Sequence, residues 1–166
     1  MFIPNIYIEK LAFYKHQFVT KDRTLELYFA GCHHNCINCQ NKFLQVQSAE
    51  TCKWITPTEL CIQLIDYVNI AKQIHIVGGE PLEQSNSALS ELCLLLKNMG
   101  FKCPIILFTG NDLDPNYINK SHPVFKNVDY VKYGHYEPTL PNTEKIKDEL
   151  TGIELATTNQ KIIKVI

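Results

Sequence analysis

Short apolar runs separated by amphipathic stretches make up most of this chain. The first run with a clear strand pattern spans residues 24–30, where Leu25-Glu-Leu-Tyr-Phe29 alternates and is rich in aliphatic and aromatic side chains. Similar runs predict four later strands, at 73–77, 104–108, 128–133 and 161–166. Two weaker apolar segments, at 6–8 and 18–19, are candidates for edge strands.

Two stretches carry the period of an amphipathic helix. Thr56-Pro-Thr-Glu59 has an N-cap, a proline at the first helical position and a glutamate three residues after the cap, so we expect a helix from residue 57 to about 71. The second predicted helix spans about 85–99 and ends before Gly100. The helix faces include Cys61 and Cys93 beside leucines, which predicts that both thiols are packed in the core.

Strands that alternate with helices favour a parallel sheet with right-handed crossovers. The chain has 166 residues, whereas a closed eightfold barrel needs roughly 250. We therefore predict an α/β fold, an open partial (β/α) barrel with a mainly parallel sheet, formed by residues 1–166 as a single domain. Residues 41–55 and 135–158 show no regular pattern and are expected to be irregular.

Composition narrows the functional classes. The formal net charge is −1, and no Lys/Arg cluster stands out, so nucleic-acid binding has no electrostatic support. No apolar run approaches the roughly 20 residues that a membrane-spanning helix needs. The N-terminus lacks the charged and apolar regions of a signal peptide, so we expect a cytoplasmic protein without a membrane partner.

Three cysteines follow the strand at 24–30. Cys32, Cys36 and Cys39 are spaced C-x3-C-x2-C, which suits thiolates that converge on a metal or cluster. A closed zinc site needs a fourth ligand, for which His33 or His34 would have to fold back within the same loop. An iron–sulfur cubane held by three cysteines instead keeps one iron open. The remaining alternative is that these three cysteines are small buried residues of the core that bind no metal.

Two further motifs follow strands of the same predicted sheet. Gly78-Gly-Glu-Pro81 ends the strand at 73–77, and Thr109-Gly110 ends the strand at 104–108. Carboxyl ends of parallel strands meet at one edge, so we expect both motifs to face the cysteines across one cleft. The glycines would let the backbone approach a ligand, and Glu80 offers a carboxylate to an ammonium group.

The combination Cys32-x3-Cys36-x2-Cys39 and Gly78-Gly-Glu-Pro81 resembles the radical S-adenosylmethionine (SAM) superfamily. Within it, residues 31–41, Phe108-Thr-Gly110 and Thr157-Thr-Asn-Gln160 resemble the activating proteins of anaerobic (class III) ribonucleotide reductases. The resemblance extends over roughly residues 24–166. It implies the radical SAM type of partial barrel and two cofactors, a [4Fe–4S] cluster and SAM.

The resemblance also implies roles for individual residues. Cys32, Cys36 and Cys39 would each bind one iron. Residues expected to hold SAM are Asn38, Gln40, Gly78, Gly79, Glu80 and, with weaker support, Thr109. Reductive cleavage of SAM would generate a glycyl radical on a large partner enzyme, an anaerobic ribonucleotide reductase. A low-potential donor such as flavodoxin or ferredoxin would supply the electron.

Two alternatives stay open at this point. A small-molecule radical SAM enzyme, similar to 7-carboxy-7-deazaguanine synthase, would use the same chemistry, but its pocket needs basic or metal-binding groups that the sequence does not reveal. A non-catalytic zinc-binding module would be colourless. For Gly79, either the glycine makes room for SAM, or it serves the backbone alone.

Overall fold

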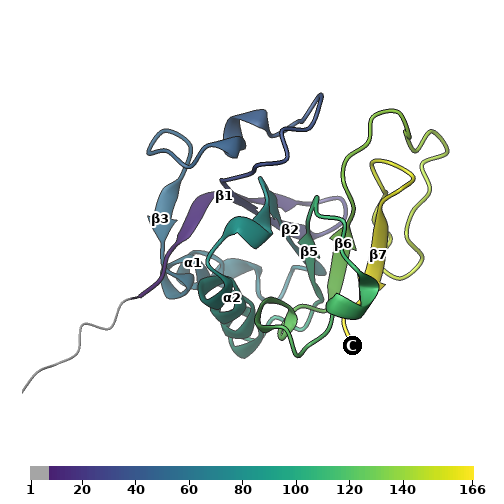
Figure 1. Ribbon diagram of the computed structural model, residues 1–166. Coiled ribbons are helices and arrows are strands. Elements are labelled where there is room, and N and C mark those ends of the chain that lie inside the picture. Colours follow the sequence, from purple (N-terminus) through teal and green to yellow (C-terminus); the bar gives the residue numbers. More distant parts are fainter. Residues whose placement is uncertain (1–7) are drawn as a thin grey trace, which may run out of the picture.

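The computed structural model describes residues 8–166, and a seven-stranded sheet forms the centre of this part of the chain (Figure 1). The strand order is β3-β1-β2-β4-β5-β6-β7. The strands are β1 (Leu11–Val19), β2 (Thr24–Phe29), β3 (Lys53–Ile55), β4 (Gln73–Gly78), β5 (Ile105–Phe108), β6 (Tyr130–Tyr133) and β7 (Lys161–Lys164). The predicted α/β class is confirmed, and the sheet is open, with β3 and β7 at its edges.

The four central strands β2, β4, β5 and β6 pair in parallel. β1 is antiparallel to β2, β3 is antiparallel to β1, and β7 is antiparallel to β6. β3 therefore points the same way as the central four strands, and the sheet is mostly parallel. Its C-terminal edge carries the loops after β2, β4, β5 and β6.

The N-terminal part of the sheet differs from the prediction. A strand of nine residues, β1, lies between β2 and β3, where only a weak segment at 18–19 was expected; residues 6 and 7 of the other weak segment lie outside the described residues. The register of β1 shifts between Phe13 and Lys15, a bulge that breaks the alternation on which strand prediction depends. β3 lies within the stretch predicted to be irregular.

Two α-helices pack against each other, α1 (Pro57–Gln63) and α2 (Asn86–Asn98). Thr56 and Glu59 form the predicted capping box, with Glu59 N donating to Thr56 Oγ1 at 3.2 Å and Thr56 N donating to Glu59 Oε2 at 2.8 Å. The predicted helix to about residue 71 is too long. It ends at Gln63, and a 3-10 turn, η2 (Ile65–Tyr67), follows, which leaves Ile65 exposed.

The core lies between one sheet face and the two helices. Leu25 and Leu27 of β2 and Ile74 and Ile76 of β4 belong to it and are fully buried. Because side chains alternate along a strand, the residues between them point to the opposite face. That face lines two cavities described below. Within residues 8–166, no helix is long and apolar enough to cross a membrane.

Candidate metal centre and its cavity

The cysteine loop begins where β2 ends, and main-chain hydrogen bonds hold its first residues. Gly31 N donates to Leu44 O at 2.7 Å, and Cys32 N donates to Gln45 O at 3.1 Å, so η1 (Lys42–Gln45) fixes its start. Asn35 and Asn38 have positive φ angles of 47° and 59°, a conformation that asparagine tolerates better than most residues. Asn35 lies between Cys32 and Cys36, and Asn38 lies between Cys36 and Cys39.

All three cysteines line one cavity of about 340 Å³. The predicted residues that border it with them are Gln40, Gly78, Gly79, Glu80 and Thr109. Asn38 instead lines a smaller pocket of about 190 Å³ that shares Cys36, Cys39 and Gln40. The structure therefore brings the motifs after β2, β4 and β5 together at one sheet edge, as the parallel topology predicts.

Neighbouring backbone explains the two glycines at the end of β4, of which Gly78 is the last strand residue. Gly78 has a φ of +117°, and a Cβ there would lie 2.3 Å from Phe29 O. A Cβ on Gly79 would lie 2.4 Å from Gly31 O and 3.1 Å from Leu44 O. Gly79 itself donates its N–H to Phe29 O at 2.8 Å. The glycines thus allow the end of β4 to pack directly on the cysteine loop, which favours the backbone role of Gly79.

Glu80 is 1% exposed and joins three segments around the cavity. Its Oε2 accepts from Gly110 N at 2.8 Å and lies 3.0 Å from His34 Nε2, while its Oε1 accepts from Leu82 N at 3.0 Å. The backbone N–H of Glu80 donates to Gly31 O at 2.7 Å. The hydrogen bonds of this carboxylate therefore link the loops after β2, β4 and β5.

The two loop histidines have different surroundings. His33 is 93% exposed at its side chain and bonds through Nδ1 to Glu83 at 2.8 Å. His34 lines the cavity, and its ring lies 5.7 Å from that of His135. His135 Nε2 is 4.0 Å from Cys36 Sγ. Each loop histidine thus has a carboxylate partner, Glu83 for His33 and Glu80 for His34.

The seven cysteines are all free thiols, but they divide by environment. Burial raises the pKa of Cys61 to about 11 and that of Cys93 to about 12, so both are inert core thiols, as predicted. Burial also raises the pKa of Cys32 and of Cys36, but these thiols stay accessible from the cavity. Accessible thiols at ligand spacing are the ones that a metal group can reach.

The donor set fits a cluster better than a single ion. Within residues 8–166, no three His, Cys, Asp or Glu side chains converge on one point as a mononuclear site requires. A cubane is wider, and its thiolates bind different irons, so its cysteines need to border one cavity rather than meet at one point. Cys32, Cys36 and Cys39 meet that criterion.

Several cavity residues were not predicted from the sequence. Glu26 and Tyr28 of β2 and Lys132 of β6 line it from the sheet, and Tyr136 lines it from the loop after β6. His135, in the same loop, lies beside Cys36. Tyr28 Oη donates to Glu26 Oε2 at 2.7 Å. The sequence did contain a signal for Glu26 and Tyr28: in β2 they occupy alternate positions with the leucines of the core, so they must lie on the opposite face of the sheet. Lys132 also supplies a basic group that the sequence did not reveal.

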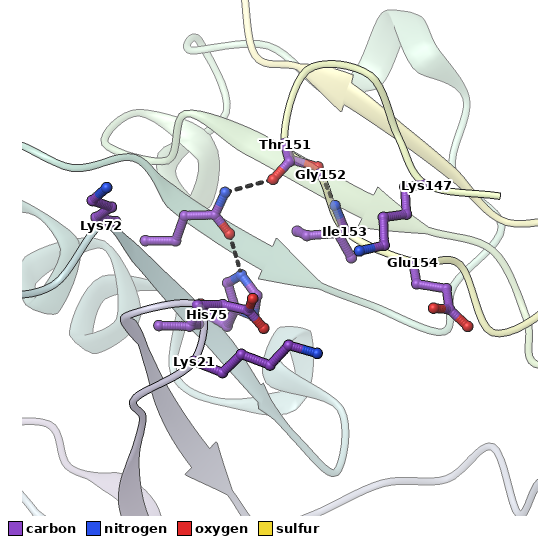
Figure 2. Close-up of a pocket in the computed structure, with 11 residues that line it drawn as sticks. Lys21, Lys72, His75, Lys147, Thr151, Gly152, Ile153 and Glu154 are labelled. Atoms are coloured by element: carbon purple, nitrogen blue, oxygen red, sulfur yellow. Dashed lines mark hydrogen bonds between the residues drawn. The ribbon is translucent and has the colours of Figure 1, made fainter. Parts of the chain in front are cut away.

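A second cavity, of about 630 Å³, lies at the start of β2 and β4 (Figure 2). His75 lies in it, donating through Nε2 to Gln73 Oε1 at 2.9 Å, and Gln73 Nε2 donates to Thr151 O at 2.6 Å. The ring of His75 also packs on Phe108, with centroids 4.9 Å apart. His75 is therefore a buried strand residue whose ring is hydrogen-bonded to Gln73 and packed on Phe108. Lys21, Lys72 and Lys147 also line this cavity.

Comparison with known families agrees with the site. A family model described as a 4Fe-4S single cluster domain matches residues 23–161, which include the three cysteines, the cavity and the central strands. No curated protein matches the chain. The matched segment is far more than half of the 166 residues. This chain therefore belongs to the family of 4Fe-4S single cluster domains.

Proposed function

We propose that this protein is a radical SAM enzyme that activates a glycyl-radical enzyme, with an anaerobic ribonucleotide reductase as its partner. The observation that carries the proposal is the meeting of three accessible thiols, the Gly78-Gly79 strand end and Glu80 around one cavity. On this proposal, the open sheet is a radical SAM-type partial barrel. The loop resemblance at residues 31–41 and the family match support the same reading.

Different residues of the cavity would hold the cluster and SAM. Cys32, Cys36 and Cys39 would hold a [4Fe–4S] cluster, and the backbone around Gln40, Gly78 and Gly79 would border SAM. When bound, these cofactors supply one-electron reductive cleavage to methionine and a 5′-deoxyadenosyl radical, which takes a hydrogen atom from a glycine of the partner. A flavodoxin or ferredoxin would provide the electron.

Glu80 has a structural role in addition to the SAM contact that the resemblance implies. Its carboxylate oxygens already accept from Leu82 N and Gly110 N and contact His34, so it holds the cavity walls in place. Glu80 also lines the cavity, so its carboxylate would face the ammonium group of SAM. Asn38, in the adjoining pocket, would act by shaping the loop between Cys36 and Cys39.

Anaerobic reconstitution followed by a SAM cleavage assay tests the proposal. With dithionite as reductant, we expect a brown protein that releases 5′-deoxyadenosine, whereas a variant with Cys32, Cys36 and Cys39 all changed to Ala releases none. A colourless zinc protein would refute the proposal. Adding the candidate reductase should give a glycyl-radical signal in electron paramagnetic resonance; cleavage without that signal would refute the partner.

One observation supports the alternative function, a small-molecule radical SAM enzyme. Lys132 places a basic group in the cavity, which is a feature that a pocket for an anionic small molecule needs. The two functions separate in the same assay. A small-molecule enzyme would cleave SAM productively without any protein radical, and mass spectrometry would then find a modified low-molecular-weight product.

A further inference from the structure

His135 lies in the loop after β6, with its imidazole beside one of the three cysteines. Its Nε2 is 4.0 Å from Cys36 Sγ, at the long end of the range for a hydrogen bond to the large sulfur atom. The backbone of His135 is fixed on both sides, because its N–H donates to Asp112 Oδ1 at 3.1 Å and its oxygen accepts from Asn159 Nδ2 at 2.8 Å. Asp112 follows β5 and Asn159 precedes β7, so two neighbouring loops hold this residue at Cys36.

The ring of His135 also contacts the cysteine loop. The ring of His34 packs against it edge to face, with centroids 5.7 Å apart and an interplanar angle of 61°. His34 is held in turn by the buried Glu80, whose Oε2 lies 3.0 Å from His34 Nε2. A row of side chains therefore runs from Glu80 to Cys36. Because these contacts already order the imidazole, a hydrogen bond to Cys36 costs little further conformational entropy.

The state of the sulfur determines what the imidazole does. A thiolate that binds iron carries no proton and can only accept, so His135 would donate through an Nε2–H group. One-electron reduction of a [4Fe–4S] cluster takes an electron from the reductant and adds one negative charge, which the cluster shares with its ligand sulfurs. A hydrogen-bond donor at one of these sulfurs stabilises that charge and raises the reduction potential.

We propose that His135 is a positioning residue of the metal centre, which donates to Cys36 Sγ, holds this ligand in place and makes the cluster easier to reduce. Groups outside the ligand set commonly orient a metal ligand and tune the metal in this way. The inference rests on the cluster of the 4Fe-4S family and not on the proposed function. It can therefore be tested without SAM.

Reduction potentials test the proposal. Anaerobically reconstituted wild-type, His135→Phe, His135→Leu and His135→Gln proteins are titrated with dithionite, and the reduced cluster is followed by electron paramagnetic resonance. Phe and Leu remove the donor with side chains of different size, so that one of them keeps the loop intact. For both we expect the reduction equilibrium to fall about tenfold, which lowers the midpoint potential by about 59 mV for one electron. Gln retains an N–H donor and should recover most of this shift.

The matched control is His33→Phe, the same change at another histidine of the site. His33 is in the cysteine loop but is exposed and bonds to Glu83 instead of to a sulfur, so its variant should keep the wild-type potential. Iron content and the Tm of the apoprotein are measured on the same preparations. His135→Phe should keep the full iron content, because all three cysteines remain, and its Tm should stay close to that of the wild type.

Three results overturn the proposal. A wild-type potential in both His135→Phe and His135→Leu would show that the imidazole does not donate to the sulfur. Iron loss in these variants as complete as in Cys36→Ala would make His135 a ligand itself. A lowered potential that His135→Gln does not recover would assign the shift to packing. A protein that shows the expected potentials but cleaves no SAM would refute the proposed function alone.

Discussion

Changing Gly79 to alanine tests whether this glycine serves the backbone or the ligand. A Cβ at this position would lie 2.4 Å from Gly31 O, 3.0 Å from Gly31 C and 3.1 Å from Leu44 O. All three are backbone atoms, and two hydrogen bonds hold them in place, Glu80 N to Gly31 O and Gly31 N to Leu44 O, each 2.7 Å long. Accommodating the methyl group therefore requires the strand end and the cysteine loop to separate.

Overpacking of this kind costs about 1–3 kcal/mol. At about 2 kcal/mol, and with about 2–4 °C of Tm per kcal/mol for a chain of this size, Gly79→Ala should lower the Tm by about 4–8 °C. The matched control is Gly110→Ala, also at a strand end beside the cavity. Its Cβ would meet the ring of His34 at 3.0 Å, a side chain rather than backbone, so its Tm should fall less.

Thermal unfolding of the apoprotein separates the two roles of Gly79, because no ligand contributes to it. Methionine release from SAM is then measured per folded molecule on reconstituted protein from the same preparation. The backbone reasoning is refuted if Gly79→Ala melts with the wild type but binds SAM poorly, because the methyl group would then occupy ligand space alone.

Three further predictions concern other residues. Cys61→Ser and Cys93→Ser should keep the full iron content, since neither thiol borders the cavity; iron loss in either one, measured after reconstitution, would contradict the ligand assignment. Burial lowers the pKa of His75 from 6.5 to about 4, so on acidification the unfolded state takes up this proton before the folded state does. The free energy of unfolding should therefore fall by about 3 kcal/mol as the pH drops from about 6.5 to 4. His75→Gln should flatten this part of a denaturant-unfolding pH profile, and an unaltered slope would show that His75 is not the group responsible. Both carboxylate oxygens of Glu80 accept from backbone N–H groups, those of Leu82 and Gly110, so the NH₂ group of Glu80→Gln would face at least one donor in either orientation. The change should cost about 1–3 kcal/mol with faster cluster loss, whereas normal stability with weak SAM binding would make Glu80 a ligand instead.

The parts of the fold that sequence predicts well are those with a local signal. The alternation in β4, the capping box of α1 and the cysteine spacing all lie within a few residues of one another, and the parallel topology then brings the loops to one edge. β1 was missed because its bulge interrupts the alternation. The helix at 57–71 was overextended because the apolar period continues through Ile65, although that residue is exposed.

The site's finer features depend on residues far apart in the chain. Glu80 meets His34 and Gly110 at separations of 46 and 30 residues, and no local pattern encodes such partners. The same holds for Gly79, whose neighbours are the backbone atoms of residues 31 and 44. Lys132 was overlooked as a cavity residue because a single lysine in a short strand is ordinarily solvent-exposed.

The separation between the core and the cysteines has a consequence for how the metal centre is assembled. None of the three cysteines belongs to the hydrophobic core, and main-chain bonds at Gly31 and Cys32 fix the start of their loop without any thiol taking part. In a zinc finger the metal supplies the folding free energy, so apoprotein and unfolded chain are the same species. Here the chain has its own core, so maturation would insert iron and sulfide into a finished scaffold, and oxidative loss of the cluster would leave a protein that can be repaired rather than refolded.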